Sequence, residues 1–465
     1  MKKEIIHIFR AYDIRGITGK TLFPDVIVKS SAIFANILED EGVRLVAVSG
    51  DGRTSSHIYT NAAAAGIAAA GLDVYVYDKL PIPTFYFKIW KEKKIGGGAY
   101  VTASHNPPEW NGIRYRRGDG TGSPEDNKVI KERFIKDEVR WASWEEVGNI
   151  YHFSNKEIIA EYLEFAWNLE PNPERKLKIV IDTMNGVGGI LIPYLLSKHH
   201  DILAINAQVD GRFPSGWPDP VDSDISKLQN LVTYTKADMG AAFDGDADRS
   251  VIVDDKGRRV QAEIVGILLA EELLKTGDVV VYNAECSSIL REKLEEMGIK
   301  TVETRVGDVF VAETAKKHKA KLCIEGSYHI FLPIYGFYYD DAMLATYIFA
   351  AILTRKKKPL SEIVDEIGRF YVLRENIHVD DAIKWDLMDY MKEKFIREYS
   401  DVSTIDGVKI YLEKASVLIR PSNTEPMIRI ISEARSETKV AEIHKEFVKK
   451  VKRYIEEYSL KVKKS

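Results

Sequence analysis

The sequence predicts an α/β protein of several domains that ends in an α+β segment. A chain of 465 residues is too long for one hydrophobic core, because single domains usually hold roughly 100–200 residues. Short apolar strands alternate with helical patterns through most of the chain, as in parallel sheets that helices cover. In about the last hundred residues, several strands instead precede one long amphipathic helix, which is typical of an α+β fold.

The first α/β segment begins with a short apolar strand at residues 44–50, RLVAVSG. The alanine-rich run at residues 61–71 is a helix that ends at Gly71, and residues 73–78, DVYVYD, form the next strand. This order of elements indicates a largely parallel sheet with covering helices.

The same rhythm starts again after the proline-rich residues 170–176. Residues 178–183 are a strand, and the turn MNGVGG and a helix from about Ile190 follow it. Two further strands, residues 239–243 and 250–255, flank the acidic loop DGDADR. The second segment is therefore another α/β unit.

The third segment has the same character, with strands in DVVVYN and KLCIEG and a helix near SSILREKLEEMG between them. The last segment differs from the first three. Its strands are FYVLREN, VKIYL and ASVLIRP, and its helix is the amphipathic run EIHKEFVKKVKRYIEEY. These patterns predict an α+β unit at the end of the chain.

Composition excludes several classes of protein. A net charge of −4 gives no electrostatic reason to expect a nucleic-acid partner. Two cysteines, Cys286 and Cys323, are too few for a disulfide framework or a cysteine-rich zinc site. The start, MKKEIIHIFRAYD, lacks the apolar core of a signal peptide, and the apolar run at residues 342–353 is too short to span a bilayer. We therefore expect a cytoplasmic protein with no membrane partner, and the sequence does not indicate its oligomeric state.

A rigid loop presents one serine in the stretch TASHNPP, residues 102–108. Pro107 and Pro108 fix their own φ angles and keep the preceding residues out of the helical region. The loop therefore holds Ser104 in a defined turn. An ordinary surface turn is the alternative, because serine, histidine, asparagine and proline are all common turn residues.

Three aspartates alternate with small residues in DGDADR, residues 244–249. In an extended chain these three carboxylates would project to one side and repel one another unless a cation lay between them. Oxygen ligands alone suit a hard cation such as Mg²⁺. A calcium loop of the EF-hand type is excluded, because its sixth and twelfth positions hold Arg249 and Asp255. An acidic surface turn is the remaining alternative, and Arg249 fits a phosphate partner beside the metal.

Two further loops carry polar residues next to strands. EGSYH, residues 325–329, follows an apolar strand, and its carboxylate and imidazole suit the hydroxyls of a sugar. RPSNTEP, residues 420–426, lies between two strands and is rich in partners for phosphate oxygens. Either stretch could instead be an ordinary polar loop. A serine hydrolase is a poor match, because no G-x-S-x-G motif is present and Ser104 adjoins His105 in the sequence.

With these four loops in this order, the whole chain resembles the α-D-phosphohexomutase family. TASHNP is similar to the family's phosphoserine loop, DGDADR to its magnesium loop, EGSYH to its sugar loop (usually E-x-S-G-H) and RPSNTEP to its phosphate-binding loop. FRAYDIRG, DTMNGVGG and DGRFPSGWPDP also resemble family segments. FRAYDIRG is closer to the phosphomannomutase/phosphoglucomutase branch, whereas RVGDVFV, residues 305–311, resembles the phosphoglucosamine mutase branch.

The resemblance implies a fold and a reaction. It implies three α/β domains of related topology, with mixed sheets and covering helices, and a C-terminal α+β domain around a central cleft. We place these domains at residues 1–149, 150–254, 255–369 and 370–465. The implied reaction interconverts hexose 1- and 6-phosphates of mannose and glucose. Ser104 carries the phosphoryl group, the intermediate is a hexose 1,6-bisphosphate, and glucose or mannose 1,6-bisphosphate is the activator.

The resemblance also assigns residues. It implies Mg²⁺ held by Asp244, Asp246, Asp248 and the phosphorylated Ser104. The residues expected to bind the substrate are Tyr12, Arg15, Glu325, Ser327, His329, Arg420, Ser422, Asn423 and Thr424. The residues expected to take part in the chemistry are Ser104, His329, Arg114 and Arg249.

Two departures from the family pattern affect these roles. Arg114 in NGIR takes the place where the family often has lysine. Arginine stays protonated and is a poor base, so we expect His329 to move the proton and Arg114 to act as a fixed charge. Tyr328 replaces the usual glycine of the sugar loop, and we expect it to narrow the sugar site.

Three alternatives to this function stay open at this point. Phosphoglucosamine mutase is the alternative within the family. A metal-dependent sugar-phosphate phosphatase, in which water intercepts the phosphoserine, is a different class. The third is a sugar-phosphate-binding protein without activity, against which the intact serine and the three aspartates argue.

Overall fold

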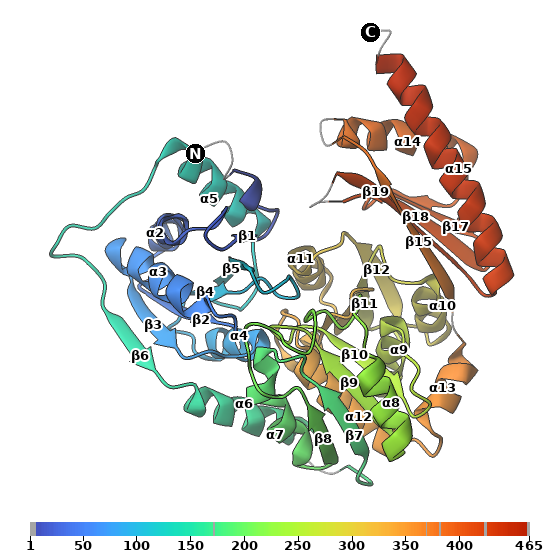
Figure 1. The fold of residues 1–465 in the computed structure, drawn as a ribbon, viewed down its shortest axis with the longest axis horizontal. Coiled ribbons are helices and arrows are strands. Elements are labelled where there is room, and N and C mark those ends of the chain that lie inside the picture. Colours follow the sequence, from blue (N-terminus) through green and yellow to red (C-terminus); the bar gives the residue numbers. More distant parts are fainter. Residues whose placement is uncertain (1–5, 171–172, 369, 381–382, 423–425, 463–465) are drawn as a thin grey trace.

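The structure, a computed structural model, describes residues 6–170, 173–368, 370–380, 383–422 and 426–462. Four sheets follow one another along the chain, and helices cover them (Figure 1). The first three units are α/β and the last is α+β, as the sequence predicts.

The first sheet has six strands in the order β1-β5-β4-β2-β3-β6. Its parallel part is formed by β2 with β3 and β4, and by β3 with β6, whereas β5 pairs antiparallel with both β4 and β1. The strands are β1 (Ile14–Ile17), β2 (Leu45–Gly50), β3 (Asp73–Tyr77), β4 (Gly97–Val101), β5 (Trp110–Arg117) and β6 (Ile150–Phe153). The helices are η1 (Ile6–Ile8), α2 (Pro24–Asp40), α3 (Ser56–Ala69), α4 (Ile82–Lys91) and α5 (Pro124–Lys136).

The second and third sheets have four strands each. The second unit holds β7 (Lys178–Asp182), β8 (Asp201–Ile205), β9 (Met239–Phe243) and β10 (Ser250–Asp254), with α6 (Lys156–Leu169), η2 (Val187–Ile190), α7 (Ile192–Ser197) and α8 (Ser226–Thr235). The third holds β11 (Val279–Asn283), β12 (Lys300–Thr304), β13 (Leu322–Ile324) and β14 (Ile330–Phe331), with α9 (Ala262–Leu273), α10 (Ser288–Glu296), α11 (Asp308–His318), η3 (Pro333–Tyr335), α12 (Ala342–Arg355) and α13 (Leu360–Ile367).

The three α/β units share one strand topology. In each unit, three parallel strands are followed by a fourth that pairs antiparallel with the third: β5 with β4, β10 with β9, and β14 with β13. The spatial orders β5-β4-β2-β3, β10-β9-β7-β8 and β14-β13-β11-β12 are therefore equivalent. Each unit consequently has one short connection that leads from an inner parallel strand to an antiparallel strand.

The fourth sheet is wholly antiparallel, in the order β15-β19-β18-β17-β16. Two helices pack against it (Figure 1). The elements are β15 (Tyr371–His378), β16 (Val402–Ser403), β17 (Val408–Leu412), β18 (Ala415–Pro421), β19 (Met427–Ala434), α14 (Lys384–Glu398) and α15 (Glu437–Val462).

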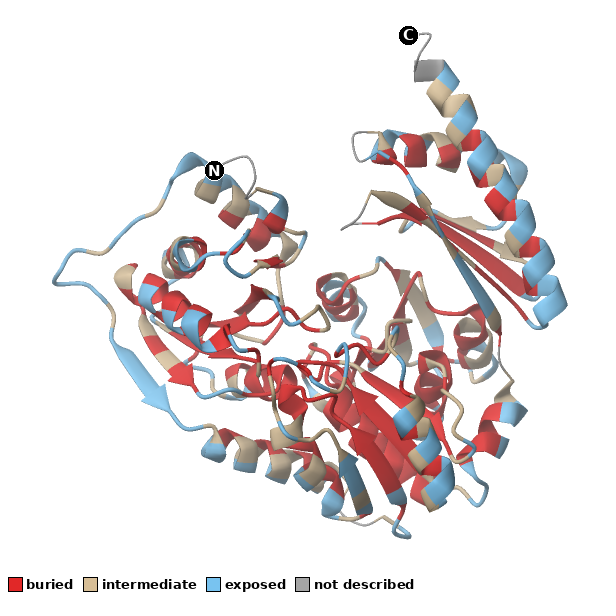
Figure 2. Ribbon diagram, viewed as in Figure 1, coloured by how far each residue is buried: buried red, intermediate tan, exposed pale blue. Residues whose placement is uncertain are grey.

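The hydrophobic core is divided unequally among the units. One apolar cluster runs through parts of the first three, and the buried helix α12 packs at its centre against α6, α7 and α9. The fourth unit has its own separate cluster under α14 and α15 (Figure 2). Within the described residues, no helix is both long and apolar enough to cross a membrane.

The strand β6 lies just inside the range predicted for the second domain, yet it hydrogen-bonds to β3 of the first sheet. All four of its residues are exposed (Figure 2). The first sheet therefore extends past residue 149, while the exact domain boundaries stay a prediction.

Candidate active site

Three of the four loops singled out in the sequence occupy the same place in three equivalent sheets. The serine loop joins β4 to β5, the aspartate loop joins β9 to β10, and the sugar loop joins β13 to β14. Each is the connection from an inner parallel strand to its antiparallel neighbour. Hydrogen bonds and ion pairs between these loops show that they meet.

Ser104 lies at the centre of the serine loop in a backbone conformation rare for serine. Its φ is +49°, in the left-handed region, and its side chain is fully buried. Its hydroxyl donates to Asp244 Oδ2 at 2.9 Å, and its Oγ lies 3.1 Å from His105 Nδ1. Its amide donates to Thr102 Oγ1, which lies 2.9 Å from Asp246 Oδ2. The hydroxyl is therefore aimed at the aspartates.

Two glycines allow the loops to approach. A Cβ on Gly245 would lie 2.5 Å from the carbonyl oxygen of Ser104, and a Cβ on Gly186 would lie 2.8 Å from the carbonyls of Asp244 and Gly245. Only glycine fits such close backbone contacts. The segment DTMNGVGG therefore packs directly against the backbone of the aspartate loop.

The three aspartates form a buried cluster that suits a divalent cation. One oxygen from each lies within 4.8 Å of the others, and all three side chains are fully buried. The Oδ1 atoms of Asp246 and Asp248 have no hydrogen-bond partner among the described residues. Burial and, next, the charge of Asp248 raise the pKa of both Asp244 and Asp246. A hard cation would satisfy these oxygens and relieve the repulsion, so the donor set fits Mg²⁺.

The sequence pattern suggested that an extended chain brings these three carboxylates together, but the loop that carries them is not extended. Residues 244–248 form a bend, and Ala247 has a φ of +68°. The alternating pattern DGDADR thus predicts the cluster, but the bend brings its members together.

Two arginines contact the aspartate cluster. Arg114 is buried and donates to Asp248 Oδ2 at 2.9 Å. The pKa of Arg114 is raised, because the nearby carboxylates, Asp248 foremost, outweigh the effect of burial. It is therefore a fixed positive charge and no base. The backbone N–H of Arg249 donates to Asp244 Oδ1 at 3.3 Å, and its Nε donates to His329 Nε2 at 3.2 Å.

The sugar loop places His329 and Glu325 beside the aspartate cluster. His329 Nε2 lies 3.4 Å from Asp248 Oδ1, and Ser327 Oγ lies 3.0 Å from His329 Nδ1. Burial lowers the pKa of His329, but Asp248 more than compensates, so the net shift is upward. Glu325 accepts from Asn283 Nδ2 at 2.8 Å through one oxygen, and its buried Oε1 lies 4.0 Å from His329 Nδ1 and has no hydrogen-bond partner among the described residues. Burial raises the pKa of Glu325.

Tyr328 has a φ of +71°, a conformation that glycine adopts without strain. Its ring packs against the apolar clusters of the neighbouring units, and burial raises its pKa to about 12. These contacts hold the ring in the core, and whether it also narrows the sugar site stays a prediction.

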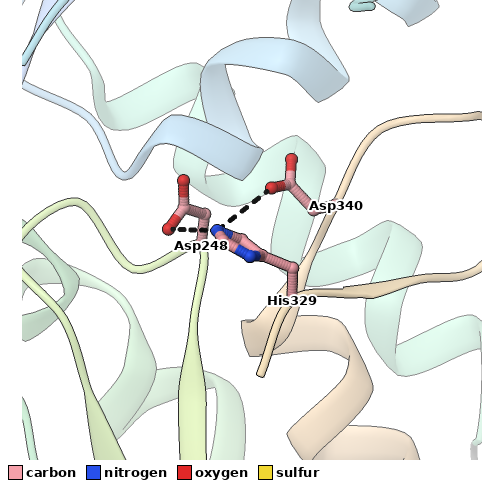
Figure 3. A group of neighbouring side chains, drawn as sticks. All are labelled: Asp248, His329 and Asp340. Carbon is pink, nitrogen blue, oxygen red and sulfur yellow. Dashed lines mark ion pairs between the residues drawn. The ribbon is translucent and has the colours of Figure 1, made fainter. Parts of the chain in front are cut away.

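A second carboxylate, which the sequence reasoning missed, completes a cluster around His329 (Figure 3). Asp340 Oδ2 lies 3.8 Å from His329 Nε2, and the carboxylates of Asp340 and Asp248 also lie close to each other. Burial and, next, Asp248 raise the pKa of Asp340 to about 8. The three residues YDD at 339–341 carried no signal for this position, because nothing in them shows that the loop after β14 returns to the site.

The N-terminal residues predicted to bind substrate lie at the edge of the same site. Arg15 donates to Asn106 Oδ1 at 2.9 Å and pairs with Asp13 at 2.7 Å. Tyr12 packs against Gly307 of the third unit, where a glycine Cβ would lie 3.0 Å from the ring. Burial raises the pKa of Tyr12 to about 12, so its hydroxyl keeps its proton.

Arg53 is a second residue that the sequence reasoning missed. It is buried, pairs with Asp51 at 3.1 Å and donates to four carbonyl oxygens of the serine loop, those of Ser104, Asn106, Pro107 and Trp110. This one guanidinium thus fixes the loop that carries Ser104. Its only trace in the sequence is DGR directly after a strand.

An ion pair that the sequence reasoning also missed links the first and third units. Arg116 donates to Asp308 at 2.6 Å, and both side chains are buried. Burial would raise the pKa of Asp308, but Arg116 and then Arg114 lower it. Asp308 begins α11 and belongs to the segment RVGDVFV.

The residues of the fourth unit lie apart from the aspartate cluster. Arg420 is buried at the end of β18 and pairs with Glu285 at 2.8 Å and with Asp406 at 3.2 Å. Ser422 is also buried, and its carbonyl accepts from Lys384 at 2.7 Å. Asn423 and Thr424 lie outside the described residues. No contact between Arg420 and the three-loop cluster is present within the described part of the chain.

Comparison with known proteins identifies the class to which this fold and site belong. Four family models cover most of the chain: phosphoglucomutase/phosphomannomutase alpha/beta/alpha domains I, II and III and the C-terminal domain, at residues 7–140, 160–257, 261–370 and 375–450. The chain therefore belongs to the phosphoglucomutase/phosphomannomutase family of the alpha-D-phosphohexomutase superfamily. It is an enzyme, an isomerase that transfers phosphate intramolecularly.

The individual relatives carry different names. A phosphoglucomutase/phosphomannomutase from Thermococcus kodakarensis is 32% identical over 444 residues, which are 94% of this chain and 96% of the relative. A protein from Methanopyrus kandleri with the name "Probable phosphoglucosamine mutase" is also 32% identical, over 97% of this chain and 98% of its own. The crystal structure of a family member from Burkholderia thailandensis has a TM-score of 0.88 at 27% identity and covers 97% of this chain and 98% of its own.

Proposed function

We propose that this enzyme interconverts the 1- and 6-phosphates of mannose and glucose through a phosphoserine and a hexose 1,6-bisphosphate. The observation that carries the proposal is the meeting of the Ser104 hydroxyl with Asp244 at 2.9 Å, inside a cluster of three buried aspartates and two arginines. A nucleophile next to concentrated positive charge and cation ligands is what phosphoryl transfer requires.

The proposed roles follow from these contacts. Phosphorylated Ser104 gives its phosphoryl group to the free hydroxyl of the sugar, so the bond from phosphorus to Ser104 Oγ breaks and a bond to the sugar oxygen forms. His329 Nε2 takes the proton that the sugar hydroxyl loses. Arg114 and Arg249 hold fixed positive charge beside the transferring group.

The residues that would hold Mg²⁺ are Asp244, Asp246 and Asp248, together with the phosphate on Ser104. When bound, Mg²⁺ supplies charge stabilisation for the transferring phosphoryl group. Glu325 and Ser327 form hydrogen bonds with hydroxyls of the sugar. Glu325 accepts through Oε1, which has no hydrogen-bond partner within the described residues. Arg15 and Tyr12 contact the substrate from the first unit.

The bisphosphate then turns over and returns its other phosphate to Ser104. Because each end of the intermediate must face Ser104 in turn, one site has to hold whichever phosphate is idle. Arg420 and Ser422, with Asn423 and Thr424, are proposed to form this site. Glucose or mannose 1,6-bisphosphate would restore the phosphoserine after any loss and so act as activator.

Phosphoglucosamine mutase is the second candidate function. The segment RVGDVFV, residues 305–311, favours it, because this segment resembles the phosphoglucosamine mutase branch. The name of the Methanopyrus kandleri relative supports it too.

The test of the proposed function is kcat/KM for four 1-phosphates, with a trace of 1,6-bisphosphate present. We expect mannose and glucose 1-phosphates to be isomerised with kcat/KM within about 10-fold of each other, and both well ahead of glucosamine and ribose 1-phosphates. Formation of the 6-phosphate, or of the 5-phosphate in the case of ribose, is followed by a coupled dehydrogenase assay, and free phosphate is measured in parallel. A preference for glucosamine 1-phosphate would replace the first candidate by the second, and stoichiometric release of phosphate would contradict both.

Replacing Arg420 with alanine is expected to weaken 1-phosphate and 6-phosphate substrates by similar factors. Loss of one charge-assisted phosphate contact raises KM by roughly 10- to 100-fold, and the shared idle-phosphate site makes the factor equal in both directions. More free 1,6-bisphosphate should escape during turnover. The matched control is Arg435→Ala, which removes a different arginine between the same two units, paired with Glu292 at 2.7 Å. A loss confined to one substrate, with no extra bisphosphate, would contradict the shared site.

A further inference from the structure

The guanidinium of Arg420 is held between two carboxylates from different units. Its NH1 donates to Glu285 Oε1 of the third unit at 2.8 Å, and its Nε lies 3.2 Å from Asp406 Oδ2 of the fourth. The Arg420 side chain is 5% exposed and that of Glu285 is 18% exposed. Glu285 therefore occupies a hydrogen-bond donor of Arg420, the arginine that the proposed function assigns to phosphate binding.

The backbone on both sides of Glu285 is fixed. Lys409 of the fourth unit is buried and donates to the carbonyls of Ala284 at 3.0 Å and Cys286 at 2.7 Å. On the other side, a Cβ on Gly326 would lie 3.0 Å from the carbonyl of Glu285. Glu285 is thus clamped between the fourth unit and the sugar loop.

The same connection, which follows β11, also holds Glu325, the carboxylate proposed to bind sugar hydroxyls. Asn283, two residues before Glu285, donates from Nδ2 to Glu325 Oε2 at 2.8 Å, and its side-chain Oδ1 accepts from the Gly326 backbone N–H at 3.2 Å. The connection after β11 therefore joins Glu325, on the sugar loop, to Arg420, on the phosphate-binding unit. Glu285 contacts both sides of this junction, the sugar loop through its backbone and Arg420 through its carboxylate.

The charges here oppose the binding of a bare anion. Arg420 carries one positive charge and faces two negative ones, Glu285 and Asp406, in a largely buried setting where screening by solvent is weak. A phosphate that takes the NH1 donor must displace Glu285, and the displaced carboxylate then lies unpaired next to the incoming anion. That state is unfavourable unless Glu285 gains a new hydrogen-bond donor.

We propose that Glu285 is a specificity-determining residue that exchanges partners when a sugar phosphate binds. Arg420 passes from Glu285 to the phosphate, and the freed carboxylate accepts hydrogen bonds from hydroxyls of the same ligand beside Glu325. A ligand that carries both a phosphate and a sugar satisfies both residues. Inorganic phosphate satisfies only Arg420, so Glu285 discriminates against it. This inference rests on the proposed function, because it takes Arg420 as a phosphate ligand.

The test compares the affinities of inorganic phosphate and glucose 1-phosphate for the full chain and for Glu285→Gln, by isothermal titration calorimetry. Glutamine keeps the shape and an acceptor oxygen but removes the charge. We expect the Kd of inorganic phosphate to fall by about 10-fold or more and that of glucose 1-phosphate to change by less than about 3-fold. The preference for the sugar phosphate should shrink accordingly. Glu285→Ala should also bind inorganic phosphate more tightly than the parent, which guards against a local defect peculiar to glutamine.

The matched control is Glu292→Gln, which removes a carboxylate from another ion pair between the third and fourth units, the one with Arg435. Its two affinities should equal those of the parent. If Glu285→Gln binds both ligands more weakly, Glu285 merely positions Arg420 and the inference is overturned, and unchanged affinities overturn it as well. Failure of the proposed function would show differently, as a parent enzyme that does not isomerise mannose and glucose phosphates.

Discussion

Replacing Ser104 with alanine is expected to lower kcat by at least about 10⁴-fold while substrate binding stays close to that of the parent. The reason is chemical. Oγ of Ser104 is the atom that the site presents to Asp244, with the aspartate cluster and Arg249 around it. Without that oxygen no phosphoenzyme forms, whereas the groups that bind the sugar phosphate are untouched. Turnover is measured in the coupled assay and binding by calorimetry.

The control for this substitution is Ser104→Gly, because Ser104 has a φ of +49°. Alanine is strained there in the way serine is, while glycine is not, so the glycine variant should be more stable than the alanine variant by about 1 kcal/mol. Both should lose turnover equally, which separates the hydroxyl from the backbone strain. After treatment with glucose 1,6-bisphosphate, intact mass should show one added phosphoryl group on the parent and none on either variant. Phosphate mapped to another residue, or retained turnover, would contradict the assignment.

Replacing Asp246 with asparagine is expected to have opposite effects on activity and on metal-free stability. Loss of a cation ligand should lower kcat by about 10²–10³-fold. In the presence of a chelator, however, the variant should unfold at a higher temperature than the parent. The three carboxylates are buried and repel one another, and the pKa values of Asp244 and Asp246 are raised first by burial and next by the charge of Asp248.

Calorimetric scans at increasing Mg²⁺ concentration distinguish the two effects. The parent should gain stability as the cation binds to the folded state, whereas the variant should gain little. The matched control is Asp222→Asn, which neutralises an exposed aspartate outside the site and should leave both the activity and the Mg²⁺ response unchanged. An equal Mg²⁺ response in the Asp246 variant would mean that the cation binds elsewhere.

The parts of the fold that the sequence predicted are those that local pattern determines. The strands at 178–182, 239–243 and 250–254 are short apolar runs bounded by turn residues, and the structure has them at those places. The buried helix α12 follows from an apolar run too long for a strand and too short for a membrane. The strand β6 was missed, because its four residues are exposed on both faces and show no alternation.

The residues of the site also fall into two groups, those that a local sequence pattern predicts and those that it does not. Ser104 lies in one short contiguous motif and the three aspartates lie in another, so each motif could be recognised directly in the sequence. Arg53, Asp340 and Glu285 are single residues that the topology brings in from distant segments, and no local pattern marks them. The bend at Ala247 shows a further limit, since an alternating pattern suggested an extended chain where the backbone turns back on itself.

The equivalence of the three connections, β4 to β5, β9 to β10 and β13 to β14, also bears on how this enzyme could change. One structural unit, used three times, carries the serine loop in the first copy, the aspartate loop in the second and the sugar loop in the third. Because these three loops lie on separate hairpins, a duplication followed by divergence could alter one of them without disturbing the other two. Sugar preference can therefore drift by substitutions confined to one hairpin, while the chemistry of phosphoryl transfer is inherited intact.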